Sequence, residues 1–166
     1  MPDSDPHGTS LVRVKRGFID LMAARVPNVS YQSPATASEI TGDDGSGASV
    51  WWLDEADHSF DVRVMVGEPL WLDETATLTL VVQVIGSDSD ATQERIDEHA
   101  ARLLGHAIAV LAADPTCGVA ATDDLTVHHA LPARVDYSAG YLDDPSKRAA
   151  KFELAVDVDS RLKLGG

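Results

Sequence analysis

The sequence predicts an α+β fold in which two helices pack on one face of a mainly antiparallel or mixed sheet, with long loops at the sheet margins. Three segments alternate apolar and polar residues with the period of a strand, and two others repeat apolar residues with the period of a helix. No internal repeat or linker divides the sequence. We therefore expect a single domain over residues 1–166, an ordinary domain length.

The first helix is expected directly after a flexible start, residues 1–8. Thr9 or Ser10 can cap the helix, and Pro27 stops it. Its apolar positions recur at helical spacing: Leu11, Val14, Phe18, Met22 and Val26. The start itself lacks the basic residues and apolar run of a secretory signal, so export by that route is not expected.

Three later segments carry the strand pattern, and each has an apolar face and a more polar face. The apolar positions are Phe60, Val62, Val64 and Val66 in the first segment, Leu78, Leu80, Val82 and Val84 in the second, and Phe152, Leu154, Val156 and Val158 in the last. A further strand, residues 48–53, carries Trp51 and Trp52, which must point to opposite faces. The polar positions favour a sheet with one face open to water or to a partner.

The first two alternating segments are expected to form a hairpin. Their connector, residues 67–74, is longer than a tight turn needs. It carries Leu70, Trp71 and Leu72 at what the pattern predicts to be an exposed tip. Large apolar side chains at such a tip indicate contact with a partner.

Two long loops are expected, at residues 33–47 and 136–149, because both stretches are rich in glycine, serine, aspartate and proline. The residues of interest in them are Asp43 and Asp44 in the first loop and Tyr137, Tyr141 and Leu142 in the second.

The second helix is expected to begin at a capping box formed by Asp90 and Gln93 and to end before Asp114 and Pro115. Its apolar stripe consists of Ile96, Ala100, Leu103, Ala107 and Leu111. A strand at residues 125–131 is expected to follow it.

The charge is strongly negative, with a formal net charge of -14 and a pI near 4.5. The excess is uneven, since residues 39–98 hold fifteen acids and only two strongly basic residues, Arg63 and Arg95. Adhesion to nucleic acid is disfavoured, because such binding depends on lysine and arginine neutralising phosphates. Two interpretations stay open: a solvated face that keeps the protein soluble, or a functional acidic surface.

No motif in the sequence indicates catalysis or a cofactor, and we expect a protein that is not an enzyme. Cys117 follows a helix end and has no cysteine partner, so it is expected to be a small turn or core residue. His128 and His129 are neighbours on a strand and cannot chelate one metal ion. An oxygen-rich cation site is conceivable along residues 54–61, which hold Asp54, Glu55, Asp57, His58 and Asp61. No apolar run approaches the roughly 20 residues of a membrane span.

The order of these elements resembles the tail terminator family of long-tailed (siphovirus-type) bacteriophages. The resemblance covers residues 11–164 and includes the Asp114-Pro115-Thr116-Cys117-Gly118 run after the second helix, which is similar to relatives in phages of actinobacteria. It also includes the closing alternating strand, residues 152–158. The strand with Trp51 and Trp52 departs from the family pattern.

The resemblance implies a virion protein that caps the tail tube as a hexameric ring and offers the head-tail joining surface around a DNA channel. The implied partners are further copies of itself, the tail tube protein and a head-completion or connector protein, with DNA passing through unbound. Assembly takes place in the host cytoplasm, and no cofactor or membrane is involved. The residues assigned to subunit or tube contacts are Leu70, Trp71, Leu72, Tyr137, Tyr141 and Leu142, and those assigned to the lumen or an axial rim are Asp43 and Asp44.

Three alternatives remain open at this point. A head-completion or connector protein of the neck would also form rings. A small metal-dependent hydrolase would use the acids of residues 54–61. A stand-alone binding module would stay monomeric.

Overall fold

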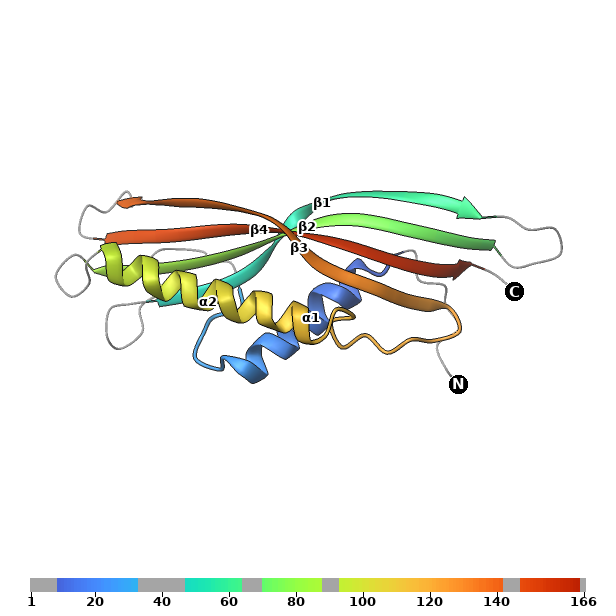
Figure 1. Cartoon of the computed structure of the whole chain (residues 1–166), viewed down its shortest axis with the longest axis horizontal. Coiled ribbons are helices and arrows are strands. Elements are labelled where there is room, and N and C mark those ends of the chain that lie inside the picture. The colour runs from blue at the N-terminus through green and yellow to red at the C-terminus, as the bar shows by residue number, and fades with distance from the viewer. Residues whose placement is uncertain (1–8, 33–46, 64–69, 88–92, 142–146, 165–166) are drawn as a thin grey trace.

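The computed structural model describes residues 9–32, 47–63, 70–87, 93–141 and 147–164. In chain order the elements are α1 (Leu11–Arg25), β1 (Gly47–Arg63), β2 (Leu70–Ser87), α2 (Gln93–Ala113), β3 (Leu125–Tyr141) and β4 (Lys147–Leu164). The strands form one sheet in the order β1-β2-β4-β3, and every neighbouring pair is antiparallel (Figure 1). The predicted α+β class is confirmed.

The strands are unusually long for a domain of this size. Each has 17 or 18 residues and therefore extends over roughly 55–60 Å, so that the strands set the long axis of the molecule (Figure 1). Both helices lie on one side of the twisted sheet, and neither described helix has the length and hydropathy of a membrane span. The helices are shorter than the strands and leave part of the sheet uncovered.

The core lies between the helices and the side of the sheet that we call the helix face. The predicted apolar stripe of the second helix is buried, as is that of the first except Val26, which follows the helix and is half-buried. The predicted positions of the second strand segment and most of those of the last are buried as well. α1 is also fastened to β1, because the indole N–H of Trp52 donates to the Lys15 carbonyl at 3.1 Å and the Trp52 ring packs on Phe18 at 5.1 Å. Trp51 pairs with Val81 on the opposite side of the sheet, which we call the open face.

The hairpin of the first two strands is confirmed, but its length was underestimated. Predicted strands 48–53 and 60–66 belong to one strand, β1, and the expected connector is strand from Leu70 onward. Phe60 and Val62, predicted as core, are exposed, because they lie on a stretch of the helix face at the sheet edge that the helices leave uncovered. Val64 and Val66 lie outside the described residues.

The expected loop at 136–149 is also wrong. Residues up to Tyr141 belong to β3 and residues from Lys147 belong to β4. Every residue from Leu131 to Gly140 is exposed, so this part of the edge strand has no core face and gives no alternating signal. Residues 1–8, 33–46 and Asp90 of the predicted capping box lie outside the described residues, while Gly47, expected as loop, begins β1.

Candidate functional site

Leu70, Trp71 and Leu72 do not form a hairpin tip. They begin β2 and pair with β1 on one side and with β4 on the other. All three are partly buried, and the Lys163 ammonium lies 6.0 Å from the centre of the Trp71 ring. The prediction of an exposed tip was wrong because the apolar residues after Pro69 belong to β2, which lies between β1 and β4. The sequence pattern does not reveal how far the pairing of these strands extends.

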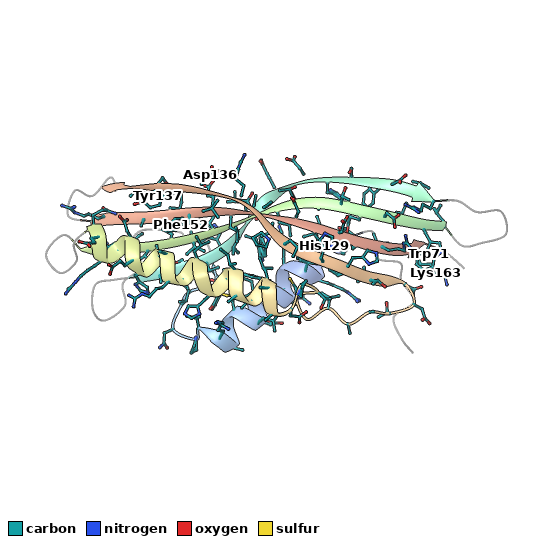
Figure 2. The ribbon with its side chains drawn as sticks, viewed as in Figure 1. Trp71, His129, Asp136, Tyr137, Phe152 and Lys163 are labelled. Atoms are coloured by element: carbon teal, nitrogen blue, oxygen red, sulfur yellow. The ribbon has the colours of Figure 1, made fainter. Side chains whose placement is uncertain are left out.

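Tyr137 and Tyr141 lie in β3, at the far end of the sheet from Trp71 (Figure 2). Trp71 pairs with Lys163 and Tyr137 with Phe152, so the two aromatic residues are separated by roughly 35 Å along β4. The structure therefore does not bring the predicted contact residues together. The other predicted positions, Asp43, Asp44 and Leu142, lie outside the described residues.

The open face carries a shallow hollow of about 550 Å³ that crosses all four strands. Its polar side chains bond to one another: Thr77 donates to Asp157 at 2.9 Å, and the His129 imidazole lies 3.2 Å from Asp159. The hydroxyls of Ser59 and Thr75 are 2.9 Å apart. The hollow is thus a polar surface with internal hydrogen bonds, and it holds the carboxylates of Asp57, Asp157 and Asp159.

Beyond the hollow, an ion-pair cluster joins three strands of the open face. Asp73 of β2 lies 2.6 Å from the Arg63 guanidinium of β1 and 2.7 Å from that of Arg161 in β4. The hydrogen bond from Arg161 lowers the pKa of Asp73 below its ordinary value. Arg134 and Lys151 also have carboxylate neighbours, Asp136 at 3.2 Å and Glu153 at 3.3 Å. Each of these four cationic groups therefore has a carboxylate neighbour, with Arg63 and Arg161 sharing Asp73.

The helix face holds one fully buried carboxylate, that of Glu74. Its Oε1 accepts hydrogen bonds from the Ser10 backbone N–H at 2.8 Å, the Ser10 hydroxyl at 2.6 Å and the Ser160 hydroxyl at 3.1 Å. Its Oε2 accepts from Thr9 at 2.5 Å and lies 3.6 Å from the His58 imidazole. These donors satisfy the carboxylate and tie the start of α1 to β2 and β4. Ser10 stands at the cap position as predicted, but its hydroxyl bonds Glu74 instead of the helix.

The two outer strands, β1 and β3, are interrupted by irregularities. In β1 the residues Leu53, Asp54 and Glu55 stand opposite a single β2 position, which leaves a regular run at 56–63. In β3 the register shifts twice, the second time beside Pro132, which leaves a regular run at 134–141. Among the described residues, the outer edges of both runs have no paired strand; an isolated bridge from Ser30 to Ser49 touches β1 only near its start.

Both regular runs expose apolar side chains on the helix face. The exposed fractions are 42% for Phe60, 54% for Val62, 40% for Val135 and 51% for Tyr137. The Tyr137 ring packs on Phe152 at 5.0 Å, and its hydrogen bond to Asp97 of α2 raises the pKa of the phenol. Sequence reasoning identified Tyr137 but treated Phe60 and Val62 as core and missed Val135, since an alternating pattern is the same whether or not a helix covers it.

The catalytic candidates considered above do not converge in the structure. Cys117 is fully buried in the turn after α2, and this burial, reinforced by Asp114, raises the pKa of its thiol to about 12. The residues proposed for a cation site lie along β1, and no group of three or more metal-ligating side chains comes together within the described ranges.

No protein-family model matches the sequence, and no curated protein matches it.

Proposed function

We propose that this chain is a structural, ring-forming virion protein, the tail terminator of a long-tailed bacteriophage. The order of elements that resembles this family is the starting point, and the free sheet edges are the observation that carries the proposal. In the order β1-β2-β4-β3, with every pair antiparallel, the two outer strands run in opposite directions.

The opposite directions of β1 and β3 favour the addition of further copies head to tail. When copies are placed side by side in one orientation, β3 of the first meets β1 of the next in antiparallel sense, so the alternation of strand directions continues across the boundary. The contact joins two different surfaces, which is the heterologous type that generates a closed ring when the rotation from copy to copy closes on itself.

The open face has a composition suited to the inside of such a ring. If the helices lie outside, the open face surrounds the channel. Arg63, Arg134, Lys151 and Arg161 each have a carboxylate within 3.3 Å, which weakens any grip on passing phosphates. The carboxylates of Asp57, Asp157 and Asp159 in the hollow add negative charge to this face. A lining of this kind lets DNA slide.

The proposal is tested by adding the purified chain to growing tail tubes of the same virus and measuring tube lengths by electron microscopy. We expect the protein to bind one tube end as a ring and to stop elongation, so that mean length falls as its concentration rises. Tubes assembled with serum albumin at equal concentration serve as the control.

Binding to portal vertices with no effect on tubes would assign the chain to head completion instead. Binding to neither, together with a monomeric mass in light scattering at all concentrations, would contradict a ring-forming role altogether.

A further inference from the structure

We propose that residues 134–139 of β3 in one copy pair antiparallel with residues 56–61 of β1 in the next copy. The inference rests on the proposed ring and names its contact. These segments belong to the longest regular run on each outer edge, residues 134–141 of β3 and residues 56–63 of β1. The other regular run of β1, Gly47–Trp52, lies beyond a bulge and is bridged by Ser30 at Ser49, while two register shifts and Pro132 precede the run of β3; bulges and proline discourage pairing.

The apolar side chains of the two runs face the same way. Val135 pairs with Leu154 and Phe60 pairs with Glu74, and both of these partners lie on the helix face. A sheet continued across the boundary keeps its faces, so the exposed pair Phe60 and Val62 of one copy meets Val135 and Tyr137 of the other on one side. Aromatic and β-branched residues are favourable cross-strand neighbours.

Several registers of β3 against β1, each two residues apart, leave these apolar side chains on the helix face. The charged residues favour one of these registers. With Val135 opposite Phe60, Arg134 stands opposite Asp61 and Tyr137 stands opposite His58. A slip of two residues one way sets Arg134 against Arg63 and Asp136 against Asp61. The same slip the other way sets Asp136 against Asp57. Like charges directly opposite destabilise a sheet, so the first register is the one we infer.

The same register gives the stagger that closure of a sheet requires. Val135 pairs with Leu154 of β4. Phe60 pairs with Glu74 of β2, which in turn pairs with Ser160 of β4. Within one copy, the positions of Val135 and Phe60 along the sheet therefore differ by six residues of β4. Six residues correspond to about 20 Å along the strands, and the four strands of a copy span about 19 Å across them. The resulting strand tilt is about 45°, at the upper end of the 35–45° typical of closed barrels, and it does not depend on the number of copies.

A cysteine pair tests this contact directly. In the variant carrying both Phe60→Cys and Val135→Cys, the new thiols lie on opposite edges of the sheet, so a disulfide between them joins two copies. Cys117 is buried and does not compete. After mild oxidation we expect a ladder of multimers on a non-reducing gel. The matched control, Val62→Cys with Val135→Cys, represents the slipped register and is expected to cross-link at least about tenfold less.

Charge exchange gives a second readout that needs no oxidation. Asp61→Arg or Arg134→Asp alone is expected to lower the oligomeric fraction in light scattering severalfold, and the two together are expected to restore it. Equal cross-linking of the control pair, a monomeric test pair, or no rescue by the double exchange would overturn the proposed register. If the wild-type chain still forms rings or stops tube growth, the function stands and only this contact is wrong.

Discussion

At the scale of single residues, the most informative side chain is Glu74. A charged residue next to Asp73 in a polar stretch is expected at the surface, yet the Glu74 carboxylate is fully buried. Its burial is tolerated because Thr9, Ser10 and Ser160, brought from both ends of the chain, donate four hydrogen bonds to it. A buried carboxylate with this many donors fixes where the N-terminus of α1 sits.

Removing this carboxylate should be costly. Glu74→Ala removes the acceptor of the buried Ser10 N–H and of the hydroxyls of Ser10, Ser160 and the partly buried Thr9, and we expect the free energy of unfolding to fall by about 3 kcal/mol. Chemical denaturation measures this loss. Thr75→Ala, at the neighbouring exposed position, is the control and should change stability by no more than about 0.5 kcal/mol. Equal small effects of both substitutions would show that the donors find other acceptors.

At the scale of elements, α1 packs closely on the turn that follows α2. A Cβ atom added at Gly17 would lie 2.0 Å from the Cys117 carbonyl oxygen, which is backbone and cannot swing aside. Cys117 itself has a positive φ of 53°, and Gly118 follows it with a φ of 69°. The glycine in α1 and the left-handed turn thus fit together, and this contact sets how the two helices approach each other.

Two glycine substitutions separate this packing from helix propensity. Gly17→Ala should destabilise the fold by about 1–3 kcal/mol, because the helix or the turn must move to admit the methyl group. Gly105→Ala in α2 meets nothing within 4 Å and should stabilise by up to about 1 kcal/mol through its better helix propensity. Thermal unfolding of the two variants checks that one substitution lowers the stability and the other raises it. If both raised it, the turn at Cys117 would have to move aside at little cost.

At the scale of the whole molecule, the dominant property is a net charge of -14 on each copy. Copies with this charge repel one another over a distance that shrinks as salt is added. In the proposed ring, the contacts at the sheet edges are backbone hydrogen bonds, apolar pairs and one opposite-charge pair, and these short-range contacts lose less to screening than the repulsion between whole copies. Association in that ring would therefore be opposed at long range and favoured at short range.

This balance predicts a salt dependence opposite to that of a complex held together by ion pairs. We expect the oligomeric fraction in light scattering to increase between about 50 mM and 500 mM sodium chloride at constant protein concentration. Dissociation on addition of salt would show instead that opposite charges across the interface supply most of the attraction.

The sequence by itself determined the class of the fold and the parts of it that touch the core. The stripes of both helices and the alternation at Leu78 and Leu154 predicted their burial, because a period of 3.6 or 2 places every apolar residue of a well-covered segment on one side. The order of elements, through its resemblance to a phage protein family, led to an assembly hypothesis, and the local pattern did not reveal the sheet edges that support it.

Only the tertiary structure decided how far the strands extend and what covers them. Phe60 and Leu78 carry the same alternating signal, but the helices cover Leu78 and leave Phe60 exposed. Residues 136–140 give no signal because this stretch of the edge strand is exposed on both faces. Burial depends on which elements pack nearby in space, and a local pattern does not contain this information. For the same reason the structure, rather than the sequence, located the exposed runs of β1 and β3 on opposite edges of one sheet.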